Sequence, residues 1–134
     1  MRVSEQTRDQ VMAVLRRLLE AAGRKDAGGI LALTDADFRG FWSVPGEKVI
    51  GKEALRRHLE RGFTQVDAVT LEFSSVHIGA EGTVAWVMAD LTCNLVRGGV
   101  GQTMDGLVTA VLRGTGHAWI FAQIHCSFPA IRGG

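Results

Sequence analysis

The chain has 134 residues, of which 46% are hydrophobic and 22% are charged. That length suits one domain over residues 1–134, and the balance is typical of a folded protein rather than a disordered one. The 15 Lys and Arg residues against 14 Asp and Glu residues give a formal net charge of +1. Binding to nucleic acid or to an anionic membrane surface requires concentrated positive charge, so we expect neither partner.

Two features predict the compartment. The first residues, 1–5 (MRVSE), lack the apolar segment of a signal peptide, and no apolar run is long enough to span a bilayer. The two cysteines, Cys93 and Cys126, lie in apolar runs with no second metal ligand at short spacing. We therefore expect two buried free thiols, a cytoplasmic protein, and neither a metal nor a cofactor.

The first half of the chain predicts helices. Apolar residues recur at helical spacing over residues 7–22 and stop at Gly23. Asp26 is placed to cap a second, shorter helix that extends to Leu33, and a third helix is expected over residues 52–62. Before the third helix, the aromatic residues 37–44 and the turn at Pro45 and Gly46 predict a short strand.

The second half predicts four strands, over residues 69–78, 83–97, 103–113 and 118–128, the last one stopped by Pro129. Short glycine-containing loops join them, which is typical of an antiparallel meander. Helices followed by a meander predict an α+β fold with the helices packed on one face of the sheet.

Alternation in the last predicted strand separates two faces. The smaller, apolar set faces the helices and consists of Ala118, Ile120, Ala122, Ile124, Cys126 and Phe128. The mixed set consists of Trp119, Phe121, Gln123, His125 and Ser127, and it is too apolar to face only water. We therefore expect a second subunit to cover this outer face, which makes the protein a homodimer through the sheet.

Asp90 is the first candidate for catalysis. It shares a strand face with Trp86 and Met88. A carboxyl held among apolar groups has a raised pKa and serves as a general base near neutral pH. The alternative is a structural Asp paired to an Arg or bonded to hydroxyls at an interface. Trp86 and Trp42 are candidates to line a pocket for a flat apolar ligand, the alternative being core packing.

His125 is the second catalytic candidate, because a neutral imidazole is the usual general base at physiological pH. The alternative is a half-buried histidine at a subunit contact. The other histidines, His58, His77 and His117, are predicted to lie on a helix face, in a strand and in a turn. Their spacing favours no metal site.

Several segments together resemble the SnoaL-like group of the nuclear transport factor 2-like superfamily. They are the long first helix, residues 31–35 (LALTD), residues 51–55 (GKEAL), and the ending 109–113 (TAVLR), Trp119 and 125–129 (HCSFP). The resemblance implies a cone-shaped α+β barrel whose curved antiparallel sheet wraps the helices around a deep pocket. It also implies that dimers through the outer sheet face are common. Members include isomerases, cyclases, dehydratases, hydrolases and non-catalytic binding domains.

The resemblance further implies that the positions of Met88, Ala110 and Cys126 belong to the pocket, with His125 on the intersubunit side. The chain has no tyrosine for an oxyanion hole, and Phe41 or Trp42 occupies the place of the isomerase base, so isomerase chemistry in its usual form is not expected. We expect a domain that binds a small apolar or aromatic molecule, with cofactor-free acid/base chemistry of isomerase, cyclase or hydrolase type. The alternative is a non-catalytic dimerisation or partner-binding module.

Overall fold

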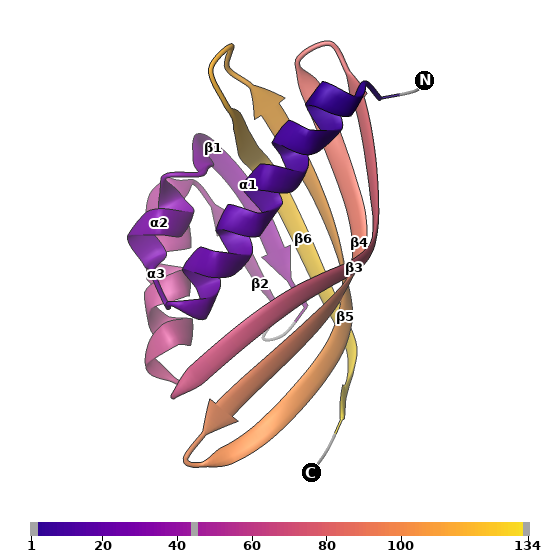
Figure 1. Cartoon of the computed structure of the whole chain (residues 1–134). Coiled ribbons are helices and arrows are strands. Elements are labelled where there is room, and N and C mark those ends of the chain that lie inside the picture. The colour runs from indigo at the N-terminus through magenta and orange to yellow at the C-terminus, as the bar shows by residue number, and fades with distance from the viewer. Residues whose placement is uncertain (1–2, 44–45, 133–134) are drawn as a thin grey trace.

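The computed structural model describes residues 3–43 and 46–132, and of residues 129–132 the backbone alone (Figure 1). Two helices, α1 (Glu5–Gly23) and α2 (Ala27–Leu31), come first. The strands β1 (Thr34–Trp42) and β2 (Glu47–Ile50) and the helix α3 (Lys52–Thr64) follow. Four long strands complete the fold, namely β3 (Ala68–Glu81), β4 (Val84–Arg97), β5 (Val100–Gly114) and β6 (Trp119–Arg132). The α+β class is confirmed, while Val44 and Pro45 of the predicted strand end and turn lie outside the described residues.

Local hydrogen bonds explain where the helices begin. The Ser4 hydroxyl accepts from the Thr7 N–H at 3.1 Å, and the Asp26 carboxylate accepts from the Gly29 N–H at 2.9 Å. Each bond satisfies one of the free N–H groups in the first turn. None of the helices in the described part of the chain is long and apolar enough to cross a membrane.

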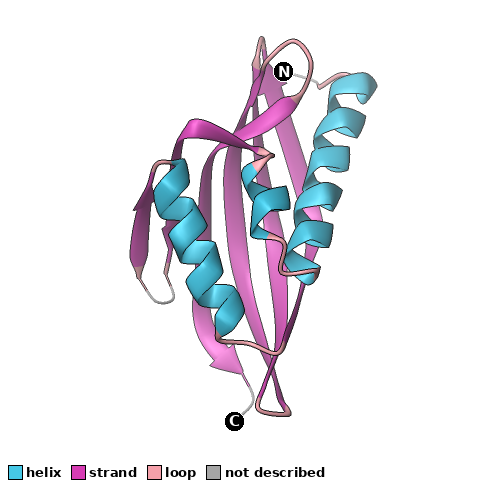
Figure 2. Ribbon diagram, turned by 90° about the vertical axis from the view of Figure 1, so that its left-hand side faces the viewer, coloured by secondary structure: helices cyan, strands magenta, loops and turns pink. Residues whose placement is uncertain are grey.

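The six strands form one curved sheet in the order β2-β1-β6-β5-β4-β3. The predicted antiparallel meander is confirmed for β3 to β6. Strand β1 joins it by pairing parallel to β6, and β2, which the sequence did not predict, pairs antiparallel to β1. The sheet stays open, with β2 and β3 at its edges, and the helices cover its concave face (Figure 2).

The main core lies between the helices and this concave face. Residues of α1 and α3 meet the inward side chains of β4, β5 and β6 there. Its most deeply buried large side chains are Phe38, Phe121, Leu55, Leu112, Val11, Val14 and Val49.

A bulge in β6 changes which side chains of that strand face the helices, so the predicted faces hold on only one side of it. Leu112 pairs with Phe121 and Val111 pairs with Gln123, so Ala122 is an extra residue on β6. The extra residue reverses the alternation on one side of it. Phe121 is therefore fully buried, and the Trp119 indole N–H donates to Gln10 of α1 at 2.9 Å. Both side chains were predicted on the outer face, and that prediction is wrong.

The strand β6 continues to Arg132, so the prediction that it stops at Pro129 is wrong. A second bulge lies at this point. Leu107 pairs with Ser127 and Asp105 pairs with Ala130, so two residues of β6 stand opposite Gly106. A proline is tolerated at such a bulge because the residue there makes no regular ladder bond.

Candidate active site

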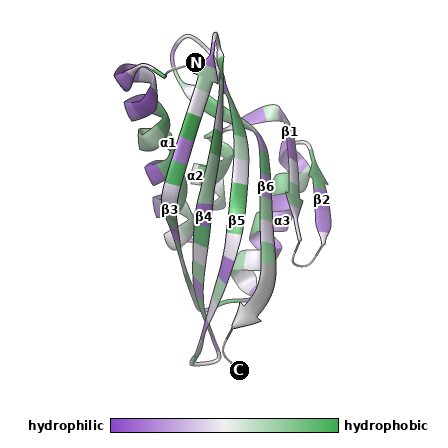
Figure 3. Cartoon of the chain, turned by 90° about the vertical axis from the view of Figure 1, so that its right-hand side faces the viewer, coloured by the Kyte–Doolittle hydropathy of each residue, from purple (hydrophilic) through white to green (hydrophobic). Residues whose placement is uncertain are grey.

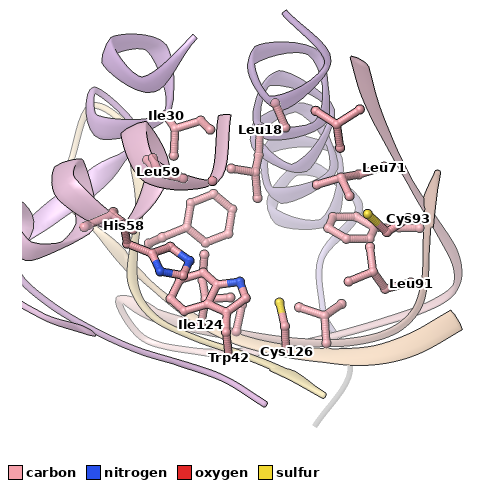
Figure 4. Close-up of a pocket in the computed structure, with 18 of the residues that line it drawn as sticks. Leu18, Ile30, Trp42, His58, Leu59, Leu71, Leu91, Cys93, Ile124 and Cys126 are labelled. Carbon is pink, nitrogen blue, oxygen red and sulfur yellow. The ribbon is translucent and has the colours of Figure 1, made fainter. Parts of the chain in front are cut away.

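A cavity of about 260 Å³ lies between the helices and the concave face of the sheet (Figure 4). Its walls are almost wholly apolar. The side chains that point into it in Figure 4 include Leu18, Ile30, Leu59, Leu71, Leu91 and Ile124. Thr34 also lines the cavity, but its hydroxyl donates to the Leu31 carbonyl at 2.8 Å. The walls therefore suit an apolar molecule.

Three of the five predicted ligand-binding residues lie in this wall: Trp42, Ala110 and Cys126. The other two, Trp86 and Met88, lie on the convex face, where they are 42% and 58% exposed. Paired residues on neighbouring strands share a face, and Met88 pairs with Thr109 while Val87 pairs with Ala110. The expected position of Trp86 and Met88 in the pocket is therefore wrong.

Both predicted catalytic residues lie outside the cavity. Asp90 is exposed on the convex face opposite Leu107, so its carboxyl is not enclosed among apolar groups in the pocket as expected. His125 is also exposed on that face, as the resemblance implied. Its Nε2 lies 3.2 Å from the Ser127 hydroxyl, and its imidazole and the Phe41 ring pack in a T-shaped arrangement with 5.2 Å between ring centroids.

A different histidine lies at the cavity. His58 of α3 lines the wall, with only 16% of its side chain exposed. Its ring stacks on the Trp42 indole at 4.4 Å between centroids and 34° between planes. Its Nδ1 contacts the Glu47 carboxylate, and its other ring nitrogen faces the cavity (Figure 4). The sequence predicted His58 on a helix face but gave it no function.

Glu47 also pairs with the guanidinium group of Arg61. Arg61 Nη2 donates to both carboxylate oxygens of Glu47, at 2.7 and 2.6 Å. The hydrogen bond from His58 is the main cause that lowers the pKa of Glu47, aided by the charges of His58 and Arg61 and opposed by partial burial. Glu47 is therefore an anion at neutral pH, and its contact with Nδ1 holds the imidazole in one orientation.

The position of Glu47 follows from β2. The strand brings Glu47 beside α3, where His58 and Arg61, three residues apart, share one helix face. The spacing of His58 and Arg61 was visible in the sequence. The acidic partner was not, because β2 is only four residues long and resembles a loop.

Both thiols face the cavity but stay neutral. Burial raises the pKa of Cys93, and burial together with the nearby Cys93 raises the pKa of Cys126 to about 12. Both are free and buried, as predicted. In residues 3–43 and 46–132, no three His, Cys, Asp or Glu side chains are grouped so that they could hold a metal ion.

Residues 11–131 match the profile of the SnoaL-like domain, so the chain belongs to the SnoaL-like family. No curated protein sequence matches it.

Several solved structures share the fold, and one of them is described as a nuclear transport factor 2-like superfamily protein. A proposed aromatic ring hydroxylase from Novosphingobium aromaticivorans superposes with a TM-score of 0.91 at 17% identity, over 99% of this chain and 96% of that one. A proposed scytalone dehydratase from the same organism gives a TM-score of 0.87 at 13% identity, over 94% and 86%. A nuclear transport factor 2-like superfamily protein from Salmonella enterica gives 0.86 at 17%, over 98% and 96%.

Proposed function

We propose that this protein binds a neutral, largely apolar small molecule in the cavity and catalyses proton transfer on it, with His58 as the general acid and base. The observation that carries this proposal is the contact between His58 and Glu47 at the wall of an otherwise apolar cavity. The chemistry needs no cofactor, and two free buried thiols suit a reducing compartment such as the cytoplasm.

The roles follow from the geometry of the pair. With its Nδ1–H directed to the Glu47 carboxylate, the neutral imidazole presents the lone pair of Nε2 to the cavity. Nε2 removes a proton from the bound molecule, and the carboxylate stabilises the imidazolium that forms. The same nitrogen then returns the proton to another atom of the substrate or to a departing group.

Isomerisation and dehydration are the reaction types that such a pair serves. Two proteins with this fold are described as proposed dehydratases, one of them a scytalone dehydratase, at 16% and 13% identity. These similarities agree with a lyase or isomerase function, and the assignment of His58 rests on this chain's own residues.

Binding in the cavity is tested with N-phenyl-1-naphthylamine, a neutral dye whose fluorescence rises in apolar surroundings. Ala110→Leu places three more carbon atoms in the cavity wall and should weaken binding about tenfold or more. The matched control is Thr109→Leu, whose side chain lies on the convex face, and it should leave the affinity unchanged. Equal affinities in both variants would place the dye elsewhere.

Proton transfer is tested with 2-tetralone in D₂O, with uptake of deuterium beside the carbonyl followed by mass spectrometry. His58→Gln should lower the protein-catalysed rate about 100-fold or more, because general acid–base catalysis contributes factors of that order. His77→Gln removes an exposed histidine of β3 and should leave the rate unchanged. An unchanged rate in His58→Gln would refute the catalytic assignment.

A second function is favoured by the convex patch, which we define as Trp86, Met88 and Leu107. These residues are 42%, 58% and 54% exposed. They belong to β4 and β5, which lie side by side in the sheet (Figure 3). Large apolar side chains grouped on one face usually mark an interaction site. We propose that a second copy of this chain covers the patch, and this dimer is compatible with a cavity on the opposite face.

A further inference from the structure

We propose that the Trp42 indole N–H binds the oxygen of a carbonyl substrate and stabilises the enolate that forms when His58 removes the neighbouring proton. This inference rests on the proposed function and deepens it, because it defines the substrate class. The substrate is a neutral, mostly apolar ketone or aldehyde that carries a hydrogen on the carbon beside the carbonyl.

The indole N–H faces open space in the cavity. Figure 4 shows the nitrogen of Trp42 on the cavity side of the ring, near the Cys126 thiol. The indole N–H of Trp119 donates to Gln10. By contrast, no described oxygen accepts a hydrogen bond from the indole N–H of Trp42. Among described residues that are not exposed, no fully buried side-chain nitrogen lacks a partner. The Trp42 nitrogen is therefore accessible, and a bound molecule can satisfy it.

The stacking places this donor beside the base. The Trp42 and His58 rings lie 4.4 Å apart, so one bound group can meet both the indole N–H and the imidazole Nε2. An indole nitrogen only donates, and a neutral imidazole Nε2 accepts. A carbonyl with an adjacent C–H offers the complementary pair, an acceptor oxygen and a removable proton.

The proton-transfer step balances within the protein and the substrate. The Nε2 lone pair takes the proton, and the electrons of the C–H bond form a carbon–carbon double bond. The carbonyl π electrons move to the oxygen, which accepts a stronger hydrogen bond from Trp42 as its negative charge grows. In a substrate with a β,γ double bond, reprotonation at the γ carbon gives the conjugated isomer. In a substrate with a β-hydroxyl group, the enolate expels that group, which takes the returned proton and leaves as water.

The absence of charged side chains among the described residues of the cavity wall favours an uncharged substrate. The described residues that line the cavity include no Lys, Arg, Asp or Glu. A carboxylate or ammonium group would lose its hydration there without an oppositely charged partner, which is costly. A neutral carbonyl loses less and recovers one hydrogen bond from Trp42.

Trp42→Phe tests the inference, because phenylalanine keeps an aromatic ring against His58 and removes the N–H. The probes are 2-naphthol, whose oxygen mimics an enol, and naphthalene, which has no oxygen. The variant should bind 2-naphthol about fivefold more weakly, the effect of one neutral hydrogen bond of about 1 kcal/mol, while its affinity for naphthalene stays unchanged. Equal losses for both probes, or no loss for either, would overturn the role of the N–H.

The rate of deuterium uptake by 2-tetralone gives a second measurement. Trp42→Phe should lower it about 100-fold, as expected for loss of an oxyanion donor. A wild-type rate in Trp42→Phe combined with a lost rate in His58→Gln would overturn this inference and leave the proposed function standing. Wild-type rates in both variants, or no naphthalene binding by the wild-type protein, would overturn the two together.

Discussion

The concave and convex faces of the sheet are built from the same strands but differ in what their side chains meet. On the concave face Val87, Ala110 and Cys126 are buried around a cavity, whereas Trp86 and Met88, their neighbours on the convex face, are exposed. The long strands supply apolar walls to the cavity, whereas Trp42 and the pair of His58 and Glu47 come from other elements. Trp42 ends β1, Glu47 begins β2, and His58 belongs to α3.

The residues proposed to transfer protons lie at the ends of β1 and β2 and on α3, not in the middle of the long strands. Asp90 and His125, the residues of the long strands that the sequence singled out for catalysis, both lie on the convex face. A sheet that wraps an apolar cavity has no place for a charge at its centre unless a partner accompanies it. A short edge strand beside a helix provides that partner at low cost, because the pair can stay partly hydrated.

The largest expected effect is a loss of stability on the concave face, at the bulge of β6. Phe121→Ala should lower the free energy of unfolding by about 3–5 kcal/mol, because it removes a fully buried aromatic ring from the core. Gln123→Ala, on the exposed side after the bulge, should change it by less than about 0.5 kcal/mol. Urea denaturation measures both values, and similar values for the two would show that Phe121 does not face inward.

Much of the fold could be predicted from the sequence, because amphipathic helices and alternating strands follow from burial of apolar side chains. Cys126 was placed on the inner face for that reason, and the resemblance placed Ala110 there as well. The faces of β4 could have been assigned as well, since the outward residues of β5 require Trp86, Met88 and Asp90 to point outward. The error came from treating each strand separately.

Other features could not be predicted from local pattern. The extra residue Ala122 reverses the faces of Trp119 and Phe121, and no residue type marks its position. The pairing of Glu47 with His58 depends on β2 folding back along β1 and on α3 packing beside both strands. These are contacts between segments that only the assembled fold brings together.

A thiol on the concave face should react more slowly with an alkylating reagent than a thiol on the convex face. Cys126 has a pKa of about 12 against its ordinary value of 9.0, so at a given pH it holds about 1000-fold less thiolate than an exposed cysteine. Iodoacetamide should therefore modify Cys126 at least that much more slowly than a cysteine introduced by Thr70→Cys, at an exposed position of β3. Peptide mass spectrometry distinguishes the sites, and similar rates would contradict the burial of the Cys126 thiol.

A smaller effect is expected when the convex face is changed. Met88→Glu places a charge at the centre of the convex patch, where a second copy would have to desolvate it, and should weaken the proposed dimer about 10-fold to 100-fold. Sedimentation at micromolar concentration measures the change, and dye binding in the cavity should persist. Thr70→Glu, at the edge of the sheet, is the control for added charge. A monomeric wild-type protein would refute the dimer.

The smallest expected effect concerns the ion pair at the rim of the cavity. The pKa of Glu47 is lowered from its ordinary value of 4.5, chiefly by the hydrogen bond from His58. Between that lowered pKa and 4.5 the unfolded state binds more protons than the folded state, so the stability that Glu47 contributes is present above pH 4.5. It is lost as the pH falls through the lowered pKa of the folded state.

Glu47→Gln should therefore flatten the fall in unfolding free energy between about pH 5 and pH 3, by at most about 1 kcal/mol, since the pair is partly hydrated. Lys48→Gln removes a charge from the same strand at an exposed position and should leave the shape of the curve unchanged. Urea denaturation at a series of pH values measures the difference. If Glu47→Gln lost as much stability on acidification as the wild-type protein, the carboxylate would not be paired with His58 in solution. The imidazole would then lack the anion that orients it toward the cavity.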